Sequence, residues 1–223
     1  MYIIFNVLLT HTVMRKVLLS LTSMMLVVST AFAQIQVGAG YLNSADRVKA
    51  NEDADANTTY LNGFYVGGGY SFRIVEGLKV TPGLYYAFAM RNDADQIGPL
   101  NLKGDVKEHY LNVPVMLSYG YGFTPDCKVF AYAGPTFSVG LSSRTTLSAN
   151  VLGFAKDTEL DNYDEDYDYS RVDCLLGGGL GMDLFKHYRI QVGYDFGLVN
   201  RYSGDGDPIR HRNQFTAGVA YVF

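Results

Sequence analysis

The segment at the end of the chain constrains the fold more than any other. Apolar residues occupy every second position up to the final residue: Phe215, Ala217, Val219, Tyr221 and Phe223. This period-two pattern predicts a β-strand with one continuous apolar face. Such a strand needs either a protein core or the hydrocarbon of a membrane to face, and the rest of the sequence decides between the two.

Eight segments alternate with period two after Gln34, and no stretch sustains helical periodicity. We place the predicted strands at about 34–43, 60–73, 78–91, 108–122, 128–142, 171–184, 188–200 and 213–223. Most exceed the roughly 9 to 11 residues that a tilted strand needs to cross a bilayer. The sequence therefore predicts an all-β fold with strands of membrane-spanning length.

The connections between these segments alternate strictly between short and long. The short ones are 74–77, 123–127 and 185–187, and the long polar ones are 44–59, 92–107, 143–170 and 201–212. Alternate connections of an up-and-down barrel lie on the same side, so all turns share one end and all loops the other. Outer-membrane barrels have this asymmetry, with periplasmic turns and extracellular loops. A soluble lipocalin-type barrel is the alternative, but such a barrel has no need for all short connections at one end and all long connections at the other.

Charged residues lie in the register opposite to the apolar face, interleaved with glycines. This pattern suits the narrow polar interior of an eight-stranded transmembrane β-barrel, which leaves room for side chains and not for an open pore. The expected interior charges are Arg73, Lys79, Arg91, Glu108, Asp173, Asp183, Arg189 and Asp195. Three prolines, Pro82, Pro114 and Pro135, fall inside predicted strands, where we expect bulges to accommodate them.

The beginning of the chain has the pattern of a cleavable export signal. Arg15 and Lys16 form a charged region after Met14, an apolar run follows, and Ala31 to Ala33 form a small-x-small cleavage site. We expect residues 1–33 to be the signal peptide, with translation starting at Met1 or Met14, and residues 34–223 to be the barrel. An N-terminal anchor helix is the alternative, although the apolar run is short for a membrane span.

Four stretches resemble the small outer-membrane β-barrel domains of Bacteroidota, the PorT-like group. They are Tyr110-Leu-Asn-Val-Pro-Val-Met-Leu117, Phe130-Ala-Tyr-Ala-Gly-Pro135, Leu176-Gly-Gly-Gly-Leu-Gly181 and Val192-Gly-Tyr-Asp-Phe-Gly-Leu198. The resemblance implies an eight-stranded barrel in the outer membrane of a Gram-negative bacterium. It also implies insertion by the outer-membrane assembly machinery, which recognises the terminal strand with Phe215, Tyr221 and Phe223.

The charge balance and the acidic loops indicate which partners to expect. Without residues 1–33 the chain holds 16 basic and 22 acidic residues, a formal charge of −6 (16 − 22), which argues against nucleic acid. Each long loop contains an Asp-x-Asp pattern, and Asp164, Asp166 and Asp168 are a possible weak site for Ca²⁺ or Mg²⁺, alongside lipopolysaccharide. A solvated acidic rim is the alternative. No other cofactor is expected.

The long loop before the sixth predicted strand contains tyrosines between its acidic residues. Tyr163, Tyr167 and Tyr169 suit adaptable recognition, so the leading hypothesis is a structural or adhesive barrel that binds host or envelope proteins. A component of an envelope secretion or assembly complex is the alternative. An enzyme is not expected, because His109 and His211 lie near the ends of the fourth and eighth predicted strands, which belong to opposite sides of the barrel.

Overall fold

The structure is a computed structural model, and it describes residues 33–49, 55, 57–97, 100–151, 154–164, 169–202 and 209–223. The expected signal peptide, up to Phe32, lies outside the described residues. Within the described part of the chain, no helix is long and apolar enough to cross a membrane.

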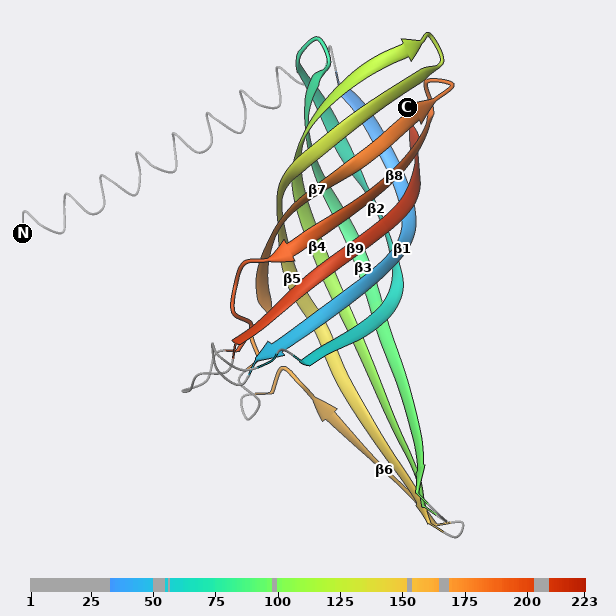
Figure 1. The fold of residues 1–223 in the computed structure, drawn as a ribbon, viewed down its shortest axis with the longest axis vertical. Helices are drawn as coiled ribbons and strands as arrows, with labels where there is room; N and C mark the ends of the chain where they lie inside the picture. The colour runs from blue at the N-terminus through green and yellow to red at the C-terminus, as the bar shows by residue number, and fades with distance from the viewer. Residues whose placement is uncertain are drawn as a thin grey trace, which may run out of the picture.

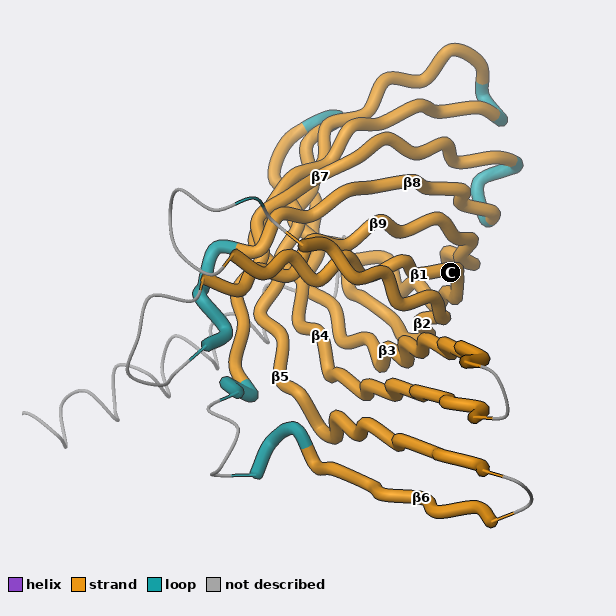
Figure 2. The backbone as a smooth tube through the Cα atoms, turned by 60° about the horizontal axis from the view of Figure 1, so that its bottom comes forward, coloured by secondary structure: helices purple, strands orange, loops and turns teal. Residues whose placement is uncertain are grey.

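The described residues form nine β-strands, eight of which close into a ring (Figures 1 and 2). Their bounds are β1 Ala33–Lys49, β2 Asn57–Val75, β3 Leu78–Ile97, β4 Leu100–Thr124, β5 Cys127–Val151, β6 Phe154–Asp161, β7 Val172–Leu184, β8 Tyr188–Gly197 and β9 Ile209–Val222. Every pairing is antiparallel, and the order β4-β3-β2-β1-β9-β8-β7-β5 closes through β4–β5 pairing. Strand β6 pairs with β5 alone and lies outside the ring. The prediction of an eight-stranded up-and-down barrel is confirmed.

Three tight turns lie at the end of the barrel where the chain terminates (Figure 1). The β2–β3 turn contains Gly77 with a φ of 80°, a conformation that glycine adopts without steric cost. The β4–β5 turn is formed by Pro125 and Asp126, as the sequence predicted. The β7–β8 turn contains Phe185 and Lys186, both with positive φ, as in the mirror-image turns that match the twist of a hairpin.

The predicted long loops at the other end are mostly strand. The predicted loop 92–107 is the continuation of β3 and β4, and much of 143–170 is the continuation of β5 together with β6. These segments form strands although their composition is polar and shows no apolar alternation. The prediction that the polar segments 92–107 and 143–170 are loops was therefore wrong for most of their described residues.

The three in-strand prolines interrupt the ladders without a bulge. The registers Pro82↔Val115, Pro114↔Thr136 and Pro135↔Leu176 continue unchanged on both sides of each proline. The observed register shifts lie elsewhere, between Arg73 and Val75, His109 and Tyr110, and Gly122 and Thr124. The expectation of bulges at the prolines was therefore wrong: a missing N–H removes a rung of the ladder, and the neighbouring rungs hold the register.

The outer face of the barrel is an aliphatic band between two belts of exposed aromatic rings. Rings near the turns are Tyr119, Tyr121, Phe123, Tyr188, Tyr221 and Phe223, and rings near the opposite end are Tyr41, Phe64, Phe137, Tyr194, Phe196 and Phe215. Between them lie exposed aliphatic side chains such as Val37, Leu84, Leu117, Leu180, Val192 and Val219. This distribution is that of a transmembrane β-barrel, with aromatic residues at both interfaces of the bilayer.

The interior is packed by aromatic rings that lie over glycines. The ring of Tyr132 extends from β5 across Gly179 of β7 and Gly193 of β8, and its hydroxyl forms a hydrogen bond with Thr216 of β9. A Cβ on Gly179 would lie 2.7 Å from the Tyr132 hydroxyl oxygen, closer than real Cβ contacts come. The high glycine content therefore allows large rings to cross a lumen only wide enough for side chains.

Candidate functional site

The charged interior set predicted from the sequence is confirmed for its central members. Glu108, Asp173, Arg189 and Asp195 are buried in the lumen, and Lys79 and Asp183 are half-buried near the turns. Arg73 is exposed beside the β2–β3 turn, and Arg91 forms an ion pair with Asp93 beyond the barrel wall. These last two residues were therefore assigned wrongly to the interior, because their strands continue past both ends of the lumen.

Six charged residues close the end of the lumen opposite the turns, and we call them the mouth cluster. They are Asp46 of β1, Glu108 of β4, Asp173 of β7, Arg201 of the β8–β9 connection, and Arg210 and Arg212 of β9. Arg201 is 1% exposed and Arg212 is 0% exposed. Three arginines meet three carboxylates, so the formal charges of the cluster balance.

Ion pairs and cation–π contacts join the members of the mouth cluster. Arg210 donates from Nε to Oδ2 of Asp46 at 2.8 Å, and its Nη2 donates to the same oxygen. Nε of Arg212 lies 3.2 Å from Oδ2 of Asp173. The Arg212 guanidinium lies 4.1 Å from the ring centroid of Tyr110. Because several N–H groups of Arg201 and Arg212 have no hydrogen-bond partner among the described residues, charge balance and stacking hold this cluster.

Two loop tyrosines cover the mouth cluster from outside. The ring centroid of Tyr169 lies 4.3 Å from the guanidinium carbons of both Arg201 and Arg210, and its hydroxyl donates to Oε1 of Glu108 at 3.3 Å. Burial raises the pKa of Tyr169 well above its usual range, and the charge of Glu108 adds to the rise, so the hydroxyl keeps its proton. Tyr163 stacks against Tyr169 with ring centroids 5.4 Å apart.

Backbone hydrogen bonds fix these covering segments to the barrel. The N–H of Ser170 donates to the carbonyl of Arg201 at 2.9 Å, and the N–H of Arg201 donates to the carbonyl of Arg210 at 2.8 Å. The N–H of Gly140 donates to the carbonyl of Arg171 at 2.7 Å. The described parts of both connections are thus tied to β5 and β9, and the lumen is closed at this end.

Beyond the closed mouth, three barrel strands continue and, together with β6, form a further sheet, which we call the outer sheet (Figure 1). It consists of residues 91–97 of β3, 100–107 of β4, 144–151 of β5, and all of β6. The pairing of β2 with β3 ends at Asn62↔Met90, so residues 91–97 have no strand on that side among the described residues. Within the same part of the chain β6 pairs with β5 only, and the outer sheet therefore has two free edges.

The structure places the predicted site residues differently from the expectation of an exposed recognition loop. Tyr163 and Tyr169 are each 8% exposed, because they pack onto the mouth cluster, so their side chains are not available to a partner. Asp164 is exposed, whereas Asp166, Tyr167 and Asp168 lie outside the described residues. No group of three or more His, Cys, Asp or Glu side chains is placed to hold a metal ion in the described part of the chain. The divalent-cation site stays a prediction.

The residues predicted to carry assembly and catalysis also have definite positions. Phe215, Tyr221 and Phe223 point outward from β9, in the two aromatic belts. His109 of β4 lies against Phe88 with ring centroids 4.9 Å apart, and His211 belongs to β9. Strands β4 and β9 are four places apart in either direction around the ring, so the structure does not bring the two histidines together.

Sequence reasoning missed four of the six members of the mouth cluster. Arg201 and Arg210 lie in a segment predicted to be loop, and Asp46 lies beyond the predicted end of the first strand. Arg212 carries a signal that was available, because it continues the inward register of Gln214 and Thr216 by one step. Arg201 carries no signal in the sequence, since its burial depends on the contact between two connections distant along the chain.

The chain is similar to one protein family and to several solved structures. The family described as "Outer membrane protein beta-barrel domain" matches residues 29–202. No curated protein matches the chain. Among solved structures, Ail of Yersinia pestis in complex with a heparin analogue is 16% identical, with a TM-score of 0.46, covering 86% of this chain and 99% of that one. Neisserial surface protein A is 13% identical, with a TM-score of 0.44 and coverages of 86% and 97%. The outer-membrane enzyme PagL is 10% identical, with a TM-score of 0.41 and coverages of 85% and 98%.

The ring of eight strands, the aliphatic outer band and the charged interior define a transmembrane β-barrel. The chain belongs to the outer-membrane protein β-barrel domain family, which matches most of its length. It is therefore an outer-membrane protein, and its aromatic belts contact membrane lipid.

Proposed function

We propose that this protein is a closed barrel that binds a protein partner at the cell surface through the outer sheet. The observation that carries the proposal is the combination of a filled lumen with a sheet that extends beyond it and has two free edges (Figure 1). A free edge strand presents unpaired N–H and C=O groups, which an extended segment of a partner can complete as an additional strand.

Strand β6 is the better of the two edges for this role. It is eight residues long and every residue pairs with β5, which holds the strand in an extended conformation before a partner arrives. Arg144 of β5 donates to Glu159 of β6 at 2.7 Å across an exposed face, which adds a lateral support. A preformed edge lowers the entropy cost of adding a strand.

The filled lumen favours binding over transport. The mouth cluster and the tyrosines that cover it occupy the cross-section at the outer end, and the rings over glycines occupy the middle. The separation of His109 from His211 favours binding over a catalytic role for these two histidines.

Two narrower assignments belong to the same proposal. We place the protein in the PorT-like group of Bacteroidota barrels, supported by the four sequence stretches that resemble it, such as 110–117 and 192–198. We also expect lipopolysaccharide at the outer aromatic belt and weak binding of Ca²⁺ or Mg²⁺ near Asp164. A role inside an envelope assembly complex is the alternative function.

The test uses proline on the edge of β6 in cells that display the protein. Thr158→Pro and Glu159→Pro each remove one backbone N–H group. Because successive N–H groups of a strand point to opposite sides, one of the two prolines removes an N–H group of the free edge. Thr158→Ala and Glu159→Ala are the matched controls. We expect cells with the protein to adhere to surfaces coated with extracellular-matrix proteins, and one proline variant to lose adhesion while both alanine variants keep it. Adhesion equal to that of cells without the protein, or unchanged in both proline variants, contradicts the proposal.

A further inference from the structure

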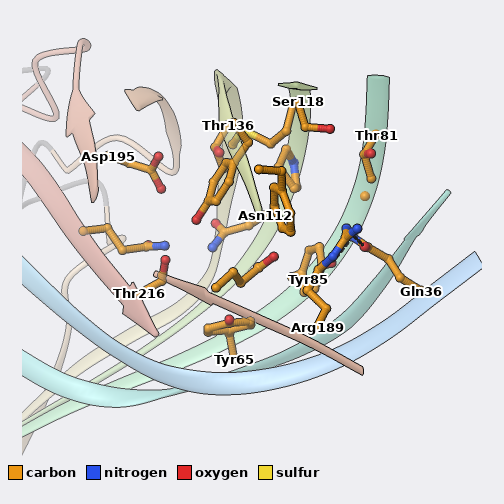
Figure 3. Close-up of a pocket in the computed structure, with 17 residues that line it drawn as sticks. Gln36, Tyr65, Thr81, Tyr85, Asn112, Ser118, Thr136, Arg189, Asp195 and Thr216 are labelled. Atoms are coloured by element: carbon orange, nitrogen blue, oxygen red, sulfur yellow. Dashed lines mark hydrogen bonds between the residues drawn. The ribbon is translucent and has the colours of Figure 1, made fainter. Parts of the chain in front are cut away.

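The lumen contains a cavity of about 100 Å³ on the turn side of the mouth cluster (Figure 3). Its lining comes from seven of the eight barrel strands and combines tyrosine rings with amide, hydroxyl and carboxylate groups. The mouth cluster separates this cavity from the outer sheet, so the role proposed above does not use it.

Two hydrogen-bond acceptors lie side by side on one wall of the cavity. Asp195 of β8 and Gln214 of β9 are direct cross-strand partners, so their Cβ atoms are about 5 Å apart. Asp195 is 8% exposed and Gln214 is 5% exposed. Oε1 of Gln214 has no hydrogen-bond partner among the described residues, and the charged group that acts on the Asp195 carboxylate is Arg212. This wall therefore presents a side-chain carbonyl without a donor next to a carboxylate.

Aromatic rings line the rest of the cavity. Tyr65 and Tyr85 are arranged edge to face with centroids 5.8 Å apart, and Tyr132 of β5 also lines the cavity. The face of an aromatic ring attracts cations, and the attraction is stronger where water is excluded. The rings and the two acceptors thus both favour a positively charged ligand.

The cations already present in the lumen are engaged elsewhere. Arg189, at the other end of the cavity in Figure 3, donates from Nε and Nη2 to the two oxygens of Asp183 at 2.7 and 2.9 Å. It also donates to Gln36 at 2.5 Å and lies over the ring of Phe130. Arg212 forms its ion pair with Asp173. The carboxylate of Asp195 is therefore left with one negative charge that no arginine of the lumen neutralises by direct contact.

We propose that this cavity binds a small primary ammonium ion, held by the carboxylate of Asp195 and the side-chain carbonyl of Gln214 against the tyrosine rings. An ammonium group brings three N–H donors and a positive charge to a wall that offers acceptors and a negative charge. A volume of about 100 Å³ is large enough for a small organic ammonium ion, since a cavity of roughly 150 Å³ holds a molecule as large as benzene. A bare alkali ion would leave most of that volume to water.

The test is calorimetric titration of the folded barrel in detergent with methylammonium chloride. N-methylglucamine chloride keeps the ionic strength constant, because this cation is too large for the cavity. We expect saturable binding, reduced at least tenfold by Asp195→Asn and weakened by Gln214→Leu, which removes the side-chain carbonyl at nearly constant size. Asp93→Asn, which removes an exposed carboxylate outside the lumen, is the matched control and leaves binding unchanged.

Three results would overturn the assignment. One is no saturable heat with methylammonium, which means that the cavity holds water only. Another is equal binding by the wild type and Asp195→Asn while both migrate as folded barrels on unboiled gels. The third is tighter binding of potassium than of methylammonium, which makes the site one for alkali ions.

Discussion

Adding one methyl group at Gly193 tests whether the interior rings require the glycines beneath them. A Cβ at this position meets the hydroxyl oxygen of Tyr132 well inside contact distance, with the ring carbon Cζ and the carbonyl oxygen of Gly178 both at 3.2 Å. Overpacking of this kind costs about 1–3 kcal/mol. Replacing a strand glycine by alanine returns roughly 0.5–1 kcal/mol through the unfolded chain. We therefore expect Gly193→Ala to destabilise the barrel by about 0.5–2 kcal/mol.

The double variant with Tyr132→Phe isolates the cause. Tyr132→Phe alone loses the hydrogen bond to Thr216, a loss of about 0.5–1.5 kcal/mol. In the double variant the clashing oxygen is gone, so the second substitution adds little, and we expect a coupling energy of about 1 kcal/mol or more. Gly104→Ala is the matched control, because its Cβ would meet only Leu147 Cδ2, at an ordinary 3.8 Å.

The assay is equilibrium unfolding by guanidinium in lipid vesicles, followed by far-ultraviolet circular dichroism. The chain has no tryptophan, so the usual fluorescence signal is not available. Additive effects of the two substitutions, or equal destabilisation by Gly193→Ala and Gly104→Ala, would refute the argument that rings and glycines are matched.

Three further predictions follow from the same geometry. The wild type should show no steady conductance in planar bilayers. The double variant Arg201→Ala, Tyr169→Ala should stay silent as well, because the rings over glycines still fill the middle of the lumen, and steady conductance of this variant would show that the mouth cluster alone closes it. Asp173→Asn leaves Arg212 buried without its partner and should lower the free energy of unfolding in guanidinium by about 3 kcal/mol or more. The exposed Asp93→Asn should lower it by less than about 1 kcal/mol, and equal losses in the two variants would contradict this. Mass spectrometry of the protein from outer membranes should give Gln34 as the first residue, and an intact N-terminal segment would disprove the signal peptide.

Alternation along the strands was sufficient to predict the barrel, because lipid on one side and a narrow polar lumen on the other leave every strand with period two. Phe223 and Asp195 were therefore assigned to the correct faces from the sequence alone. The three turns were equally readable, since Pro125 and Asp126 carry local conformational preferences that need no tertiary contact.

The mouth cluster and the outer sheet were not predictable in the same way. Arg201 is buried because a loop segment folds back over the lumen, and Tyr163 and Tyr169 are buried because they stack on the cluster rather than face water. The outer sheet lacks a single apolar face, so its strands have no period-two signal, and pairing between β5 and β6 holds them instead. Contacts between segments distant along the chain decide both features.

The central claim is that the tight turns face the periplasm and the outer sheet stands at the cell surface. Labelling of intact cells with a membrane-impermeant maleimide tests it most directly. Both native cysteines are first changed to serine. A single cysteine is then placed by Thr158→Cys in β6 or by Glu76→Cys in the β2–β3 turn. We predict labelling at position 158 and none at position 76 until the outer membrane is opened. Labelling at position 76 with none at position 158 would contradict the orientation and, with it, the proposed role of the outer sheet.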